Sequence, residues 1–250
     1  MNKDRNLFQV QISFPDIIKV TFVVAAYFIA FWIAYPFPGA ERIQVAIWPA
    51  GGIGLAVLLL SPRRLWLIIL AAFFLAGNIS NLMIGRPLFN SMGFMIANVI
   101  ESYGCAWVIV RWCGENIRFT TVKEIFALIF AATVVNAGTA VIGGGTAWLA
   151  GLSPFWNFWK FWWIADGLGI LIVAPLIVSW GTISNFSVRH QWKIGLEGGL
   201  FMSIWIKISQ LSFQVQQSDD PFTARPYLLV ALLAYAAIRL GQRGVTAALF

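Results

Sequence analysis

Two acidic residues lie in the middle of long apolar runs, where an acidic group needs either a partner or a function. Glu101 falls near the centre of the run 89–110, and Asp166 falls near the centre of the run 155–179. A charged side chain at the centre of a bilayer costs about 3 kcal/mol or more, so such residues commonly bind ions, protons or polar ligands. A protonated acid that is hydrogen-bonded to a neighbouring helix is the structural alternative.

Polar and aromatic residues accompany both acids at helical spacing. Asn98 precedes Glu101 by three residues and therefore shares its helix face. Two tryptophans lie one turn before Asp166, and Trp48–Pro49 is expected to open the second apolar run from the outer side of a membrane. We therefore expect a ligand pocket between the bilayer midplane and its outer surface, formed by Trp48, Asn78, Asn98, Glu101, Trp162, Trp163 and Asp166.

The asparagines have a second interpretation. Asn78 and Asn81 are spaced to share a face of the third run, and Asn136 lies in the fifth. Side-chain amides within a membrane often hydrogen-bond one helix to another, and this structural role is the commoner one. The glycines of 51–54 and 143–145 are most simply explained as positions of close helix packing.

The composition indicates the elements that must position these residues. Of the 250 residues, 60% are hydrophobic and only 11% are charged, against about a quarter in soluble domains. In lipid, long apolar segments become helices because each backbone polar group must be paired within the segment. The sequence therefore predicts an all-α polytopic transmembrane bundle in a single domain, residues 1–250, with about eight spans: Ile17–Tyr35, Gln44–Leu60, Leu65–Ile84, Phe89–Val110, Val122–Ile142, Phe155–Ser179, Ile194–Phe213 and Pro226–Leu240.

The basic residues predict the orientation of the bundle. If the spans are right, 12 of the 17 Lys and Arg lie on the side that holds the N-terminus and the Arg63–Arg64 turn. Cytoplasmic loops carry an excess of Lys and Arg, so the N-terminus is expected in the cytoplasm. The net charge of +7 is spread among these loops rather than along one stripe, which argues against nucleic acid as a partner and favours the lipid bilayer.

The chain lacks the residue sets that catalysis would require. Its single histidine, His190, and its two cysteines, Cys105 and Cys113, match no haem, metal or disulfide pattern. No phosphate-binding glycine loop and no nucleophile–base–acid set can be assembled. We therefore expect no enzymatic activity, no metal and no cofactor in this chain.

Several motifs resemble one known family. Trp48-Pro49-Ala50-Gly51-Gly52, then Asn78, then Asn98-x-x-Glu101 follow its order, and the string from Trp162 through Asp166 to Pro175 is the most specific match. Ala237-Ile238-Arg239-Leu240-Gly241 fits a late stretch of the family, with Leu240 in place of Phe. Over nearly its whole length the chain resembles the MASE-type membrane-associated sensor domain of the first class.

The resemblance implies a function. Such domains are N-terminal inputs of bacterial histidine kinases and diguanylate cyclases, so it implies an inner-membrane sensory domain for an unknown small ligand or membrane partner. We further expect a homodimer formed through an output region. The alternative is a small-solute transporter or the substrate-binding subunit of one, since intramembrane acids and internal repeats occur there. A weak repeat of Pro49–Phe74 in Pro226–Phe250 is consistent with that alternative.

The C-terminal residues suggest a longer native protein. Gly244–Phe250 begins an apolar run of seven residues, whereas a span needs about 20. We expect this run to continue as a further helix, to be followed by another span and then by a cytoplasmic output domain.

The orientation can be tested by chemical labelling. Single cysteines replace Arg63 and Asp219 in a variant without Cys105 and Cys113, and intact cells are treated with a thiol reagent that does not cross the membrane. We expect labelling at position 219 and none at position 63 until the cells are permeabilised. The opposite pattern would show that the basic loops face outward.

Overall fold

A computed structural model describes residues 14–34, 48–181, 199–201, 203–204 and 207. The described residues are helical and contain no strand: α1 (Phe14–Ala34), α2 (Pro49–Leu59), α3 (Trp66–Met83), α4 (Leu88–Cys113), α5 (Val122–Phe130), α6 (Asn136–Leu149) and α7 (Phe155–Gly181). The chain divides into two compact units, Met1–Ala174 and Pro175–Phe250, and the first contains α1 to α6 and most of α7.

Four described segments are long and apolar enough to cross a membrane: Arg63–Met83, Leu88–Cys113, Val122–Leu149 and Phe155–Gly181. They match four predicted spans to within a few residues, except that the fifth predicted span, Val122–Ile142, continues to Leu149. The described part thus shows fewer spans than the eight predicted. The predicted spans Ile194–Phe213 and Pro226–Leu240, the segment Gly244–Phe250 and the second copy of the proposed repeat fall largely or wholly outside the described residues.

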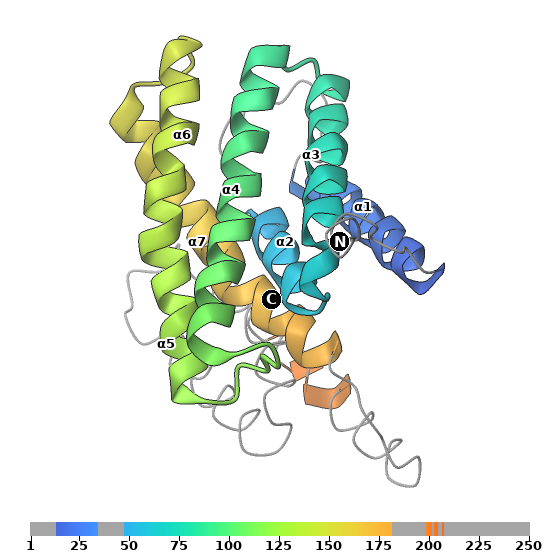
Figure 1. Ribbon diagram of the computed structural model, residues 1–250. Helices are drawn as coiled ribbons and strands as arrows, with labels where there is room; N and C mark the ends of the chain where they lie inside the picture. Colours follow the sequence, from blue (N-terminus) through green and yellow to red (C-terminus); the bar gives the residue numbers. More distant parts are fainter. Residues whose placement is uncertain (1–13, 35–47, 182–198, 202, 205–206, 208–250) are drawn as a thin grey trace, which may run out of the picture. The chain divides into compact units, whose positions relative to one another are not determined.

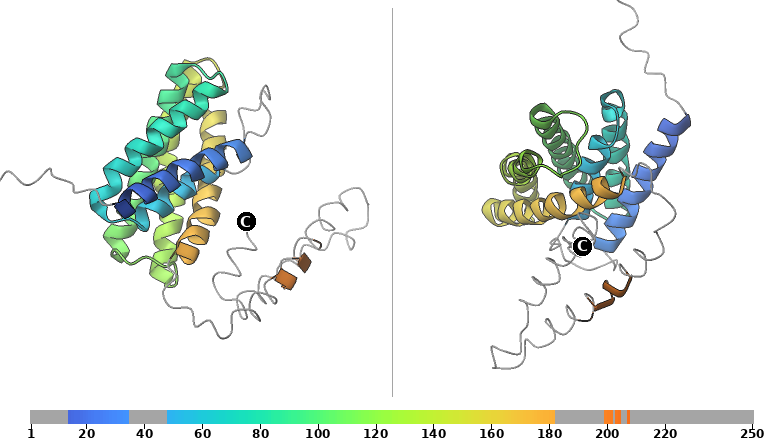
Figure 2. Two further views of the ribbon diagram at one scale, coloured as in Figure 1. Left: turned by 90° about the vertical axis from the view of Figure 1, so that its right-hand side faces the viewer. Right: turned by 90° about the horizontal axis from the view of Figure 1, so that it is seen from below.

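Helix α4 lies at the centre of the first unit. It packs between α3 and α6, and these three helices run side by side (Figure 1). Helix α1 lies obliquely across α2 and α3, as the left view of Figure 2 shows. The side chains of Tyr27 and Phe31 anchor it there, since both are fully buried and Tyr27 meets Phe73 edge to face.

Helix α2 is a short helix enclosed by its neighbours. It has 11 residues, of which nine are buried. At 1.5 Å per residue it extends for about 16 Å, roughly half of the bilayer core. The prediction of a helix over Gln44–Leu60 is therefore wrong at its start: Trp48 has an extended backbone (φ −104°, ψ 94°), and the helix begins at Pro49. Proline favours the first helical position and disfavours helical backbone in the residue before it.

The start of α2 lies inside the bundle and not at its surface. The backbone N–H of Trp48 donates to the carbonyl of Ala165, which is in the middle part of α7 (3.0 Å). The Trp48 indole nitrogen donates to the side chain of Asn98, near the midpoint of α4 (3.1 Å). Both bonds hold Trp48 at mid-helix depth, and the expectation that Trp48–Pro49 opens its run from the outer side of a membrane stays a prediction.

Glycines allow α2 and α7 to meet backbone to backbone. A Cβ atom on Gly52 would collide with the carbonyl oxygen of Gly169 and with Val173. A Cβ atom on Gly169 would collide with the carbonyl of Trp48. These two glycines therefore set the spacing at which the first turn of α2 reaches the middle of α7.

One turn of the helix between α5 and α6 is widened. Residues Ala131–Val135 form a π-helical segment inside an otherwise continuous helix. Such a segment leaves carbonyl groups outside the regular ladder, and π-segments are frequent at functional sites. In this segment the carbonyls of Ala131 and Thr133 accept from Cys105 on α4 (3.6 Å) and from the indole of Trp163 on α7 (2.9 Å).

Two ion pairs connect loops that the sequence analysis places on the same side of the membrane. Arg64, in the turn between α2 and α3, pairs with Asp16 at the start of α1 (3.0 Å). Arg63 pairs with Glu115, which follows α4 (3.1 Å). The start of α1, the α2–α3 turn and the α4–α5 loop thus lie at the same end of the first unit, as the pattern of basic residues predicts.

The backbone contact at Gly169 predicts a stability difference between two glycine substitutions. Gly169→Ala places a methyl group against the Trp48 carbonyl, and overpacking of this kind costs about 1–3 kcal/mol. Gly145→Ala is the matched control, because no atom lies within 4 Å of its added Cβ. In thermal unfolding of the purified domain, we expect G169A to melt at a lower temperature and G145A at an unchanged or slightly higher one. Equal melting temperatures for the two variants would contradict the close contact.

Candidate ligand site

Glu101 and Asp166 come together from two different helices. Glu101 is fully buried and Asp166 is 3% exposed. An ideal Cβ on Gly51 would lie 2.9 Å from Oε1 of Glu101 and 3.3 Å from Oδ1 of Asp166, so the two oxygens are no more than about 6 Å apart. The two acids that the sequence places at matched depth therefore form one cluster.

Each of these carboxylates has an oxygen without a hydrogen-bond partner, namely Oε1 of Glu101 and Oδ1 of Asp166. The other oxygen of Glu101 accepts a long bond from Thr139 (3.4 Å). The indole nitrogen of Trp162 lies beside Glu101 but outside hydrogen-bonding geometry. Buried polar atoms are normally paired, so this cluster is an exception that needs a physical explanation.

The first turn of α2 lies against both acids. Gly51, its third residue, has no Cβ at the point where one would touch both unpaired oxygens, and no side chain caps this helix end. A helix N-terminus presents unpaired N–H groups and about half a positive charge. The positive end of α2 therefore faces a pair of acidic groups, an arrangement in which broken membrane helices bind charged species.

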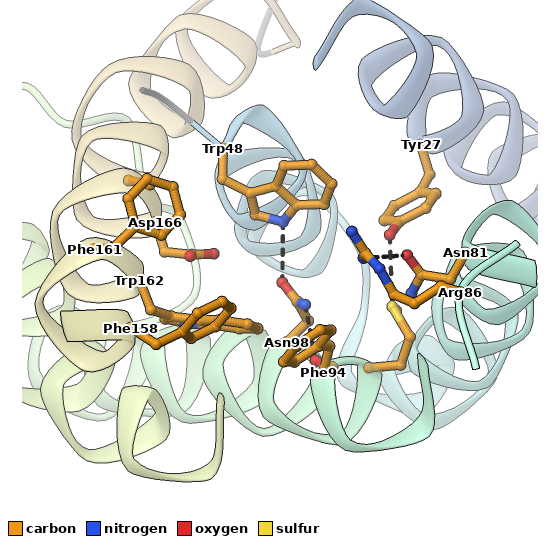
Figure 3. Close-up of a pocket in the computed structure, with 12 residues that line it drawn as sticks. Tyr27, Trp48, Asn81, Arg86, Phe94, Asn98, Phe158, Phe161, Trp162 and Asp166 are labelled. Carbon is orange, nitrogen blue, oxygen red and sulfur yellow. Dashed lines mark hydrogen bonds between the residues drawn. The ribbon is translucent and has the colours of Figure 1, made fainter. Parts of the chain in front are cut away.

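Asp166 also faces a cavity of about 50 Å³, which Figure 3 shows. By the usual measure of one water per roughly 10–15 Å³, the cavity has room for a group of a few heavy atoms. It is lined by Tyr27, Trp48, Asn81, Arg86, Phe94, Met95, Asn98, Phe158, Phe161, Trp162, Ala165 and Asp166. Glu101 lies behind this wall and does not line the cavity.

Comparison with known proteins assigns the chain to a family. The family model MASE1 matches residues 19–250, which is nearly the whole chain. The chain belongs to the MASE1 family. No curated protein and no solved structure matches it. With its apolar helices, this membership identifies a membrane-embedded sensory domain of signal transduction and not a catalytic domain.

Three of the predicted site residues do not line the cavity of this MASE1 domain: Glu101, which lies behind Asp166, and Asn78 and Trp163. Asn78 accepts from the Ser91 hydroxyl (2.7 Å) and donates to the Phe74 carbonyl (2.9 Å), so it joins α3 to α4. The indole of Trp163 donates to the Thr133 carbonyl (2.9 Å) and so joins α7 to the π-segment. Both residues serve helix packing in the structure. Trp48, Asn98, Trp162 and Asp166 line the cavity, and Asn136 bonds α6 to the Trp163 carbonyl (2.8 Å).

The sequence interpretation included Trp48 and Trp162 but not Phe94, Phe158, Phe161 or Arg86. Phe158 and Trp162 precede Asp166 at intervals of four, and Phe94 precedes Asn98 by four, so each shares a helix face with a predicted residue. That spacing could have identified these aromatic residues as part of the cavity wall. Arg86 lies in the loop between α3 and α4, where its guanidinium donates to Asn81 (2.6 Å) and lies 5.4 Å from the centre of the Phe94 ring. No sequence spacing identifies a loop residue that folds back in this way.

The described residues of the MASE1 domain contain no group of three or more His, Cys, Asp or Glu side chains able to hold a metal ion. What they do offer is a small cavity lined by one carboxylate, two side-chain amides and several aromatic rings, with a second carboxylate behind its wall. Such a set can bind and orient a small polar molecule.

The bond between Trp48 and Asn98 ties the start of α2 to the midpoint of α4, and its removal has a predictable effect. Trp48→Phe keeps an aromatic ring but leaves Oδ1 of Asn98 without this donor. Loss of a buried hydrogen bond costs about 1–3 kcal/mol when a partner is left unpaired. We expect a lower melting temperature for the purified domain, whereas the control Trp107→Phe, on an outward-facing residue that is 51% exposed, should leave it unchanged. An unaltered melting temperature in W48F would mean that the bond contributes nothing to stability.

Proposed function

We propose that this MASE1 domain is the sensory input of a bacterial inner-membrane signalling protein, and that a small polar ligand binds in the cavity beside Asp166. The support is the cluster of two buried acids at the start of α2, because unpaired polar groups at membrane depth are expensive and mark functional sites. A membrane protein partner at the same site is the second form of stimulus that the family resemblance allows.

The signal would pass through the elements that meet at this cluster. The first turn of α2 contacts α7 through Gly52 and Gly169, and Trp48 bonds to both α4 and α7. A ligand that binds one arrangement of these helices more tightly than another shifts the population toward it. The N-terminus and the Arg63–Arg64 end face the cytoplasm in this proposal, and the remaining predicted spans connect the bundle to an output domain that forms the homodimer.

A solute transporter is the second candidate function, and one observation favours it. Helix α2 begins in the interior beside acidic groups, as the broken helices of transporters do. Uptake of labelled solutes into vesicles that contain only this chain would identify a transporter. The sensory proposal predicts no uptake and a native protein that carries an output domain.

The proposal predicts the effect of one isosteric change. In the full-length protein, Asp166→Asn should hold the output at one constant level across a panel of growth conditions, because the ligand would lose its charged contact. Output is measured with a transcriptional or second-messenger reporter, and immunoblots establish that abundance in the membrane is unchanged.

Asp16→Asn is the matched control for this experiment. Asp16 is equally buried, but it is paired with Arg64 at the other end of α1 from the cavity. Regulation should survive in D16N. If D166N keeps a normal regulated output, the cluster is not the sensory site; if D166N no longer accumulates in the membrane, Asp166 has a structural role.

A further inference from the structure

The charges around Asp166 do not balance within the described residues. Two carboxylates would carry two negative charges when both are ionised, and the start of α2 would offset about half of one. Neither Glu101 nor Asp166 forms an ion pair in the part of the chain that the structure describes. Because an unpaired charge in the interior of a bundle is costly, either protons or a bound cation must balance the charge of this cluster.

Arg86 does not supply the balancing charge. Its guanidinium is engaged with Asn81 and lies over the ring of Phe94. In Figure 3 the Arg86 guanidinium lies to the right of the hydrogen bond between Trp48 and Asn98, and the carboxylate of Asp166 lies to its left. The cavity therefore has an acidic part and a basic part, which the Trp48–Asn98 bond separates.

The acidic part of the cavity has aromatic walls. In Figure 3 the Asp166 carboxylate lies between the indoles of Trp48 and Trp162, with Phe158 and Phe161 beside it. The rings of Phe158 and Trp162 pack at 6.0 Å, and both pack on Phe94, at 5.4 and 5.6 Å. Aromatic faces attract organic cations, and rings grouped around a charge are the usual site for ammonium groups.

An inorganic cation fits these walls less well. Sodium and calcium need several oxygen ligands around one point. The other oxygen-bearing side chains that line the cavity, Tyr27, Asn81 and Asn98, are already hydrogen-bonded, and most of the remaining lining is aromatic. The aromatic walls therefore favour a cation whose own surface is apolar.

We propose that the cavity binds a small organic ammonium ion, with Asp166 as its anionic partner and the rings of Trp48, Phe161 and Trp162 as its walls. This inference rests on the proposed function in taking the cavity as the sensory site, and it adds the chemical class of the ligand. Glu101 acts behind Asp166, where its negative charge strengthens the attraction for the cation.

The test is a titration of the whole chain in lipid nanodiscs, followed by tryptophan fluorescence. The probes are methylammonium chloride and tetramethylammonium chloride, in potassium chloride at constant ionic strength. We expect a saturable change with at least one probe, and a loss of affinity of roughly tenfold or more in Asp166→Asn, because bonds to charged groups are the strong class. Asp16→Asn should bind as the unmodified chain does.

Three further arms decide the nature of the ligand. The neutral analogue tert-butanol should give no saturable change, and an equal response to it would overturn the proposal. Sodium chloride should give none either, and a change with sodium alone that depends on Asp166 would show an inorganic site and overturn it. A response to pH in the absence of any effect of either ammonium probe would show that protons balance the charge, and it too would overturn the proposal.

A second variant covers the case in which D166N fails to fold. Phe161→Leu removes one aromatic wall and leaves the acids in place, and it should weaken ammonium binding roughly twofold to fivefold. Unchanged affinity in F161L would contradict the aromatic site. Regulated output without ammonium binding would leave the sensory function standing and overturn the ligand class. Ammonium binding without regulated output would support the ligand class and overturn the sensory function.

Discussion

Two carboxylates, no more than about 6 Å apart and against the first turn of a helix that begins inside the bundle, set the main constraint on this structure. A helix that starts in the interior exposes N–H groups where no water reaches them, and lipid offers nothing to accept their hydrogen bonds. Negative groups beside that helix end are a favourable solution, since they meet its positive dipole. The acids and the positive end of the short helix therefore attract each other.

The rest of the first unit supports this arrangement through close packing. Gly51, Gly52 and Gly169 remove the Cβ atoms that would hold α2 away from the acids and from α7. The π-segment provides carbonyls that bond Trp163, and Asn136 at its end bonds α6 to α7. These contacts surround the acids with fixed groups while leaving one oxygen of each acid without a partner.

The sequence predicted the parts of this structure that depend on composition and helical spacing. Apolar runs of about 20 residues identified the long helices, and the depth of Glu101 and Asp166 indicated that they could meet. The family was also predicted and is confirmed. The role of the acids in binding remains a prediction.

Other parts depend on tertiary contacts that no spacing encodes. The apolar pattern around Trp48 reads as one long span, yet Pro49 and the Trp48 bonds to Ala165 and Asn98 start the helix in the interior. Asn78 is a polar residue of a type common in binding sites, but its hydrogen bond from the Ser91 hydroxyl makes it a link between α3 and α4. Arg86 reaches the cavity only because its loop folds back toward Asn81 and Phe94.

The two acids share one buried cluster at the start of α2. An experimental structure of the domain in lipid nanodiscs, at a resolution that defines carboxylate oxygens, tests it most directly through the separation of Glu101 Oε1 and Asp166 Oδ1. We predict a separation within about 6 Å, with Gly51 beside both oxygens. A separation beyond direct or water-bridged contact, or either carboxylate facing lipid, would contradict it.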